Sequence, residues 1–202
     1  MGLTSHLVVM AKHPALGRVK TRLAEGVGAV EAMRFYRHAS REVLRRVAHD
    51  PRWRTLLALT PDAARHDAGI WPDGIPLIAQ GEGDLGHRMG RLMRDLPAGP
   101  VVIIGSDIPD IGAAHIALAF RKLGDADAVF GPADDGGYWL VGLKRRPRVP
   151  EIFDNVRWSG EHALADTRAN AERAGLRVAM LGVLADIDTA EDLKRWKRER
   201  RA

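Results

Sequence analysis

The sequence alternates short apolar runs with segments of helical periodicity, and this alternation restricts the fold more than any other feature. The short runs, each the length of a β-strand, cover residues 7–11, 55–60, 75–80, 101–105, 127–131 and 177–182. Apolar residues recur at three- and four-residue spacing in the intervening segments 28–48, 84–96, 112–123, 160–174 and 189–200. Such alternation is typical of a Rossmann-like α/β fold, a mostly parallel sheet with helices on both faces.

One further apolar run, YWLVGL at 138–143, breaks this rhythm. It follows the run at 127–131 after too few residues to include a crossover helix. Parallel neighbours need a connection of about a dozen residues or more. We therefore expect either an antiparallel strand here or a strand of a neighbouring small sheet, and a mixed sheet overall.

Length and composition narrow the class of protein. The chain has 202 residues, so we expect a single domain over residues 1–202, at roughly 100–200 residues per domain. The lack of cysteine excludes disulfides and thiolate metal sites and suits a reducing cytoplasm. We find no pattern of a signal peptide and no apolar run of about 18 residues, the length that spans a bilayer. We therefore expect a cytoplasmic protein without a membrane span.

The net charge of +5 and the pI near 10.0 suggest a nucleic-acid partner, but the positive excess is uneven. Much of it lies in the last predicted helix, in DLKRWKRERRA, where Trp196 is the only aromatic residue. A nucleic-acid-binding surface normally intersperses base-stacking aromatics among its cations. Cations at a helix C-terminus also complement the macrodipole. We therefore interpret this helix as a solvated face, with nucleic-acid binding as the less favoured alternative.

Charged residues gather where the predicted strands end. Ligands of open α/β sheets bind beyond the carboxyl ends of the strands. There the chain places cations after the first strand, in AKHPALGRVKTRL, and acidic residues after the fourth and last strands, a layout that suits a polyphosphate with a divalent cation. A solvated basic loop is the alternative for the cations. The residues expected to bind the nucleotide and its phosphates are Lys12, Arg18, Lys20, Arg22, Gln80 and Arg88.

Asp107 is the first candidate for a metal ligand and a catalytic residue. It follows the buried run VVIIG in VVIIGSDIPDIG, where Pro109 stiffens the turn. Mg²⁺ and Mn²⁺ prefer oxygen ligands, and one or two carboxylates often bridge them to substrate phosphates. A helix cap is the alternative role, which we assign to Asp110, two residues before the predicted helix.

The segment DIDTAEDL, before the last predicted helix, allows two interpretations. Asp188 or Thr189, followed by an acidic residue three positions on, makes a capping box. Asp186 and Asp188 share one side of an extended segment, so either can instead face a cation. We expect Asp188 to be the second metal ligand and leave Asp186 as the alternative.

Substrate contacts are expected in GPADDGGYW and at a tryptophan further on. Asp135 is a second candidate catalytic residue, for orienting or deprotonating an acceptor. Gly136 and Gly137 allow close approach of the backbone to a ligand, although a hairpin turn also explains them. The residues expected to bind the substrate are Gly136, Gly137, Tyr138 and Trp158, the last of which can alternatively cover the sheet.

These motifs together resemble a known bacterial family. The segments AKHPALGRVKTRLAEGVG, QGEGDLGHRM, VVIIGSDIPDI, GPADDGGYWLVGL, VRWSGEHALADT and LADIDTAEDL are similar, in this order, to glycosyltransferase-like transferases associated with radical-SAM and selenium domains. This family resembles the nucleotide-diphospho-sugar transferase superfamily, which includes 2-phospholactate guanylyltransferase and molybdenum-cofactor guanylyltransferase. The resemblance covers nearly the whole chain and implies a type A glycosyltransferase fold.

The resemblance also implies site roles. The superfamily's cation-binding aspartate after the central strand corresponds to Asp107, and the ligand before the last helix corresponds to Asp188. The second position of the D-x-D motif of glycosyltransferases falls on Pro109 here, and the glycine-rich opening loop of nucleotidyltransferases is mostly replaced by cations. We therefore expect side chains, more than backbone N–H groups, to hold the donor phosphates.

The sequence thus predicts a transferase that uses Mg²⁺ or Mn²⁺ and a nucleotide donor. The donor is a nucleotide sugar or a nucleoside triphosphate, so the reaction is glycosyl or nucleotidyl transfer to a small-molecule acceptor. A nucleotide-binding module without catalysis is the alternative from another class.

Overall fold

The strands of the computed structural model, which describes residues 3–146 and 148–200, form one continuous sheet. Its order is β3-β2-β1-β4-β6-β5-β7. The strands are β1 (His6–Lys12), β2 (Arg54–Thr60), β3 (Leu77–Ala79), β4 (Val101–Gly105), β5 (Ala128–Pro132), β6 (Tyr138–Leu143) and β7 (Val178–Met180). All described strand pairs are parallel except those of β6, which runs antiparallel between β4 and β5. The predicted mixed, mostly parallel sheet is confirmed, and 138–143 lies within the main sheet.

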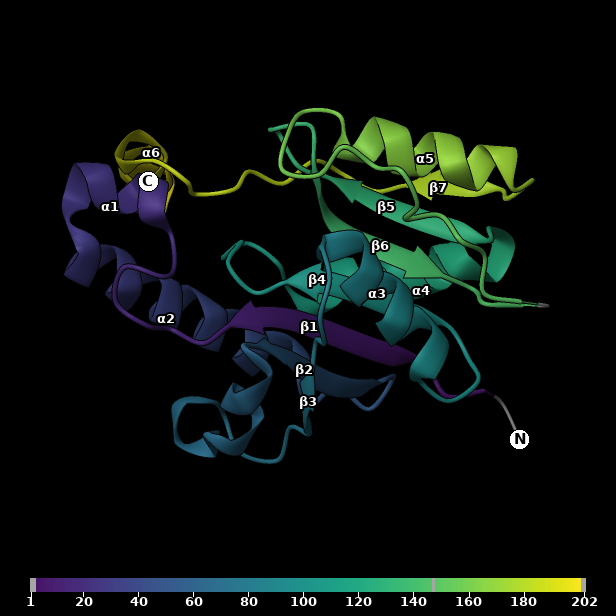
Figure 1. Cartoon of the computed structure of the whole chain (residues 1–202), viewed down its shortest axis with the longest axis horizontal. Helices are drawn as coiled ribbons and strands as arrows, with labels where there is room; N and C mark the ends of the chain where they lie inside the picture. Colours follow the sequence, from purple (N-terminus) through teal and green to yellow (C-terminus); the bar gives the residue numbers. More distant parts are fainter. Residues whose placement is uncertain (1–2, 147, 201–202) are drawn as a thin grey trace.

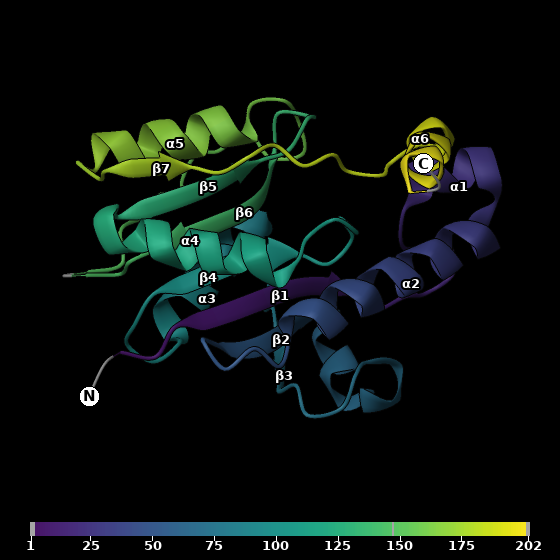
Figure 2. The same cartoon turned by 180° about the vertical axis from the view of Figure 1, so that it is seen from behind.

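Helices cover both faces of the sheet, as predicted (Figures 1 and 2). Side chains of α2 and α4 join the buried cluster on one face, and those of α3 and α5 join the cluster on the other. The α-helices are α1 (Thr21–Val27), α2 (Ala29–Val47), α3 (Leu85–Asp95), α4 (Ala113–Asp125), α5 (Ala163–Arg173) and α6 (Ala190–Glu199). Two 3₁₀ helices, η1 (Asp62–His66) and η2 (Ala68–Ile70), follow β2. No helix in 3–146 or 148–200 has both the length and the apolarity that crossing a bilayer requires.

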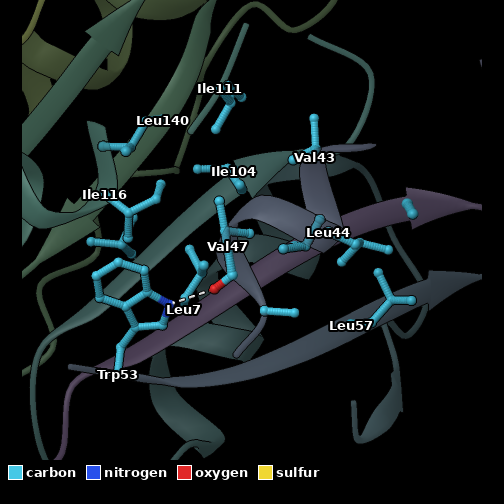
Figure 3. Packing of buried hydrophobic residues seen from close by; sticks show 14 of the residues in the cluster. Leu7, Val43, Leu44, Val47, Trp53, Leu57, Ile104, Ile111, Ile116 and Leu140 are labelled. Carbon is cyan, nitrogen blue, oxygen red and sulfur yellow. Dashed lines mark hydrogen bonds between the residues drawn. The ribbon is translucent and has the colours of Figure 1, made fainter. Parts of the chain in front are cut away.

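Alternate side chains of the central strands enter the two cores. Leu7 of β1 packs in the cluster under α2 and α4, whereas Val8 packs in the cluster under α3. Both are fully buried, which explains why the central strands read as continuous apolar runs instead of alternating ones. At the edge of the first core, the indole N–H of Trp53 donates a 2.9 Å hydrogen bond to the carbonyl oxygen of Val47 (Figure 3).

The sheet reverses its strand order beside β1. From β1 the chain adds β2 and β3 on one side, whereas β4 pairs on the other side. Open α/β sheets bind ligands at such a switch point, beyond the carboxyl ends of the strands. In Figure 1 the arrowhead of β1 points toward the side of the molecule where α1 and α6 lie.

Helices α1, α2 and α6 form a small core of their own beyond this edge. Leu23, Ala32, Ile187 and Leu193 make up its buried cluster. Gly26 of α1 lies so close to α6 that an added Cβ would come within 2.6 Å of Ala190 Cβ. The close packing of α1 and α6 therefore depends on a glycine inside a helix.

Replacing Gly26 by Ala tests this close packing. Alanine favours the helix by about 1 kcal/mol, but the added methyl must push Ala190 away. Overpacking generally exceeds that gain, so we expect Gly26→Ala to lower the free energy of unfolding by about 1–3 kcal/mol in urea denaturation. The paired variant Gly26→Ala/Ala190→Gly removes the opposing methyl and should recover part of the loss. A Gly26→Ala protein as stable as the wild type would contradict the contact.

Candidate active site

Three carboxylates converge on the ammonium of Lys20. Its Nζ lies 3.0 Å from Asp107 Oδ2, 2.7 Å from Asp186 Oδ1 and 2.8 Å from Asp188 Oδ1. The Lys20 side chain is only 3% exposed. Asp107 follows β4, the other two aspartates precede α6, and Lys20 precedes α1. The cluster therefore joins three distant parts of the sequence at the switch point of the sheet.

Lys20 adopts a left-handed backbone conformation, with φ 47° and ψ 50°, as the N-cap of α1. Non-glycine residues are uncommon in this region, which costs on the order of 1–3 kcal/mol at strained sites. Such a conformation persists where the surroundings fix it. Here the three carboxylates hold the end of the side chain while the first turn of α1 holds its backbone.

The cap of α6 explains why two aspartates are available to Lys20. Thr189 is the N-cap: its Oγ1 accepts from Asp192 N at 3.1 Å, and Asp192 Oδ2 accepts from Thr189 N at 2.9 Å. The predicted capping box is thus formed by Thr189 and Asp192. Asp186 and Asp188 are left to face the lysine, so both alternatives from the sequence lie in the cluster.

The predicted cap at Asp110 is wrong. Gly112 is the N-cap of α4, and Asp110 Oδ1 accepts a 3.2 Å hydrogen bond from the indole nitrogen of Trp196 in α6. Two residues separate Asp110 from the first helical residue, Ala113, so its side chain is free to reach the neighbouring helix. Asp110 therefore connects the loop that carries Asp107 to α6.

The cluster perturbs the protonation of its members. Burial disfavours the charged amine of Lys20, but the nearby charges of Asp107, Asp186 and Asp188 outweigh it, so the pKa of Lys20 is raised. Burial and the charge of Asp107 raise the pKa of Asp186 to about 6, against the opposing effect of Lys20. The site is thus a partly buried, net negative group of carboxylates with one buried ammonium at its centre.

A buried network of hydroxyl groups lies beside the cluster, at Ser106, the residue before Asp107. The hydroxyl of Tyr36 in α2 accepts from Lys12 N at 2.8 Å and lies 3.2 Å from Ser106 Oγ, which also accepts from Ser40 at 3.1 Å. Burial and the charge of Asp107 raise the pKa of Tyr36. Sequence reasoning missed this network, although the helical spacing of Tyr36 and Ser40 indicates burial, and a buried tyrosine normally needs a partner for its hydroxyl.

Two open cavities meet at the aspartates. The first, of about 560 Å³, extends from them to Gln80, Asp84 and Arg88. The second, of about 570 Å³, extends toward Asp135 and Trp158. Asp107, Asp186 and Asp188 line both. Each volume is in the usual range of small-molecule sites, about 300–1,000 Å³, so each cavity is large enough for a small molecule beside the carboxylates.

The predicted cations differ in their distance from the cluster. Lys12 and Arg22 line both cavities, and Arg22 Nη1 lies 3.7 Å from Asp188 Oδ2 with its side chain 72% exposed. Arg18 is exposed on a turn in which its N–H donates to Ala15. It is not among the described residues that line these two cavities.

Gln80 and Arg88 line the first cavity, but both also hold backbone in place. Gln80 is buried, and its Nε2 donates to the carbonyl oxygens of Ala11 and Ala58, at 3.1 and 2.9 Å. Arg88 Nε donates to Gly83 O at 2.9 Å. The amide nitrogen of Gln80 is therefore engaged by strands β1 and β2, and a role of either side chain toward a nucleotide stays a prediction.

The predicted substrate residues lie around the second cavity, with one difference. Asp135, Gly137, Tyr138 and Trp158 line it, and Asp135 Oδ1 accepts a 2.9 Å bond from Gly137 N. Gly136, with φ 84°, instead abuts the loop before α5: a Cβ there would lie 2.4 Å from the carbonyl oxygen of residue 161. The close approach that this glycine allows is to protein backbone, so its contact with substrate stays a prediction.

The donor set of the cluster suits a hard divalent cation, because three carboxylates offer the oxygen ligands that Mg²⁺ and Mn²⁺ prefer. The described residues nevertheless include no group of three histidine, aspartate or glutamate side chains already arranged to hold a metal. The carboxylates instead surround Lys20 Nζ at 2.7–3.0 Å, farther than the roughly 2.1 Å of Mg–O bonds. The carboxylates of Asp107, Asp186 and Asp188 therefore match a divalent cation in their chemistry. They would have to move closer together to coordinate one.

Comparison with known proteins gives matches in sequence. Residues 43–160 match the model of a family described as uncharacterized proteins conserved in bacteria, DUF2064. A stretch of 101 residues is 32% identical to 2-phospho-L-lactate guanylyltransferase from Methanopyrus kandleri. It covers 48% of this chain and 50% of that enzyme, so the chain spans about half the length of this curated relative.

Solved structures give matches in fold. A Desulfovibrio desulfuricans G20 protein assigned as a nucleotide-diphospho-sugar transferase has a TM-score of 0.88 and 33% identity, over 98% of this chain and 88% of that chain. Rv0371c from Mycobacterium tuberculosis H37Rv, in complex with manganese, has a TM-score of 0.51 and 17% identity, over 95% and 96%. The second match shows a common fold only. The first agrees with the resemblance that the sequence indicates.

The raised pKa of Asp186 predicts how stability depends on pH in the presence of a chelator. Between the ordinary value of 3.8 and about 6, the folded protein binds more protons than the unfolded chain, so the free energy of unfolding falls as pH rises. Asp186→Asn removes this ionisation. Its stability relative to the wild type should therefore rise between pH 4 and pH 7, by about 1–3 kcal/mol in urea unfolding with EDTA.

The matched control is Asp125→Asn, at the exposed end of α4. Its stability relative to the wild type should change little over the same pH range. An Asp186→Asn protein whose relative stability does not grow with pH would contradict the description of the cluster.

Proposed function

We propose that this chain transfers a nucleotidyl group to a small-molecule acceptor. The chain belongs to the DUF2064 family of proteins conserved in bacteria and is a nucleotide-using transferase. The donor is a nucleoside triphosphate and the reaction depends on a divalent cation. The similarity to a guanylyltransferase supports nucleotidyl over glycosyl transfer and makes GTP the first donor to test.

One observation carries the proposal: the aspartates around Lys20 stand at the junction of two cavities, with further cations beside them. A transferase must bring a charged donor and an acceptor to a single point. The strand order reverses at this point, where α/β sheets usually bind ligands. The charges and the shape of the site therefore both suit a reaction between a charged donor and an acceptor.

The first cavity is assigned to the donor. Lys12, Lys20 and Arg22 contact its phosphates, whereas Arg18 would have to turn from the exposed loop toward the cavity to reach them. Guanidinium groups bind phosphate oxygens in pairs, and lysines act as point charges. Gln80 and Arg88 lie toward the base and ribose. These positively charged side chains take the place of a glycine-rich loop.

Asp107, Asp186 and Asp188 hold the divalent cation, Mg²⁺ or Mn²⁺. When bound, the ion neutralises phosphate charge and stabilises the negative charge that develops in the transition state. The manganese complex of Rv0371c concerns a protein that shares only the fold, but it agrees with a cation in this class of structure.

The second cavity is assigned to the acceptor. An acceptor oxygen attacks the α-phosphorus, the bond from that phosphorus to the bridging oxygen of the β-phosphate breaks, and pyrophosphate leaves. Asp135 orients the acceptor or takes its proton, with Gly136, Gly137 and Tyr138 nearby and Trp158 as an apolar wall. The cations on the donor side stabilise the departing pyrophosphate, and a single well-placed donor is commonly worth about 3 kcal/mol.

Glycosyl transfer from a nucleotide sugar is the second candidate, supported by the assignment of the D. desulfuricans protein. The two reactions differ in their products. Nucleotidyl transfer releases pyrophosphate from a triphosphate, whereas glycosyl transfer releases a nucleoside diphosphate from a nucleotide sugar. Because the same fold can accommodate either donor, the released product identifies the reaction.

The test incubates the protein and Mg²⁺ with GTP or other triphosphates, or with nucleotide sugars, over a panel of phosphorylated and hydroxylated small acceptors. We expect pyrophosphate release that requires both metal and acceptor. Asp107→Ala should lower kcat/KM at least about 100-fold, because the loss of one charge-stabilising group commonly costs 10²–10³. Asp125→Asn should retain wild-type activity.

Activity that persists in Asp107→Ala would refute the metal assignment. Nucleoside diphosphate as the product would replace nucleotidyl by glycosyl transfer. Nucleotide-dependent thermal stabilisation without turnover across the panel would favour a binding module.

A further inference from the structure

We infer that Lys20 and the divalent cation occupy the three-aspartate cluster alternately: Lys20 holds the carboxylates in the metal-free protein and leaves them when the metal binds. The released ammonium then enters the donor cavity, which Lys20 already lines. This inference rests on the proposed function for its metal. Beyond that function, metal binding frees Lys20 from the aspartates so that its ammonium can contact the donor phosphates.

The first argument is that both cations need the same oxygen atoms. Lys20 Nζ contacts one oxygen of each of Asp107, Asp186 and Asp188. Asp186 Oδ1, the closest of these, also accepts the N–H of Ile187 at 2.6 Å, which fixes its direction toward the lysine. A metal bound through these oxygens would lie almost on the ammonium, and like charges at that distance in a buried site repel strongly. The two cations therefore exclude each other.

The second argument concerns the charge of the cluster. Within the part of the chain that the structure describes, the ion pairs of Asp107 and Asp186 are with Lys20 alone, and Asp188 has a second, longer one with the exposed Arg22. Three partly buried carboxylates held this close together without a cation would repel one another. Lys20 therefore stabilises the metal-free site, and its departure requires another cation to take over the carboxylates.

The third argument is that the exchange has a route. The Asp107 and Asp188 side chains are 33% and 37% exposed and line both cavities, so a cation can reach them from solvent. The lysine ammonium is carried on a flexible four-carbon stem. The left-handed backbone at residue 20 fixes only the base of that stem. The ammonium can thus turn into the donor cavity while α1 stays in place.

The direct test measures the reactivity of the lysine amines in the wild-type protein. An amine-acylating reagent is applied in EDTA, in Mn²⁺, and in Mn²⁺ with GTP, and each labelled lysine is quantified by mass spectrometry. We expect Lys20 to be protected in EDTA, to react several-fold faster in Mn²⁺ and to be protected again when GTP is added. The exposed Lys194 and Lys197 of α6 serve as internal controls and should react equally in all three conditions.

A second test measures metal affinity. Free Mn²⁺ is followed by electron paramagnetic resonance during titration of the wild type, Lys20→Met and Lys12→Met. Removal of the competing ammonium should tighten Mn²⁺ binding at least about tenfold. Lys12→Met removes the same charge from the first cavity, which both lysines line, without removing a partner of the aspartates, so its effect should be much smaller. Near-ultraviolet circular dichroism verifies the fold of each variant, and the labelling test needs no variant.

The outcomes separate this inference from the proposed function. Mn²⁺ binding to the wild type without a change in Lys20 labelling would overturn the exchange and leave the metal-dependent transferase intact. Weaker Mn²⁺ binding by a folded Lys20→Met protein would also overturn it, because Lys20 would then support the metal site. If Mn²⁺ binds to neither protein, both the exchange and the metal assignment fail.

Discussion

The organisation of the site depends on one interaction, the burial of the Lys20 ammonium among three carboxylates. Charged groups are buried only when they are paired, so each member of the cluster restricts where the others can lie. The segments that carry them begin α1, follow β4 and precede α6. The interaction therefore links both ends of the chain to the centre of the sheet. The contacts of Gly26 with Ala190 and of Trp196 with Asp110 serve the same end, because they hold α6 against its neighbours.

Most of the fold was predictable because burial on both faces leaves a strong pattern. The runs at 101–105 and 127–131 became β4 and β5. The short connection to 138–143 left an antiparallel strand and a strand of a small neighbouring sheet as alternatives, and the structure shows the first. Helix α1 was not predicted, because its seven residues are too few to establish a helical period. The strand expected at 75–80 was shortened to β3, since Pro76 has no N–H to donate to a ladder.

The site was predictable as a location but not as a set of contacts. The rule that ligands bind at the carboxyl ends of strands indicated Asp107 and the early cations. Sequence could not distinguish Lys20 from Arg18, since the two lie in one basic loop and only the fold shows which is buried. It also could not decide whether Asp186 faces the cluster, because that depends on Thr189 acting as the cap of α6. Hydrogen bonds between distant segments leave no periodic signal.

The charge of the cluster restricts how substrates can arrive. Three ionised carboxylates and one ammonium carry a net charge of about −2. The nearby Arg22 and protonation of Asp186 near its raised pKa make this charge less negative. A triphosphate that approached this group unaccompanied would meet repulsion in a partly buried site, where screening is weak. A divalent cation reverses that balance, and it also releases a lysine for the phosphates if it displaces Lys20. The electrostatics therefore favour a nucleotide that binds with or after its metal, and they disfavour the free nucleotide.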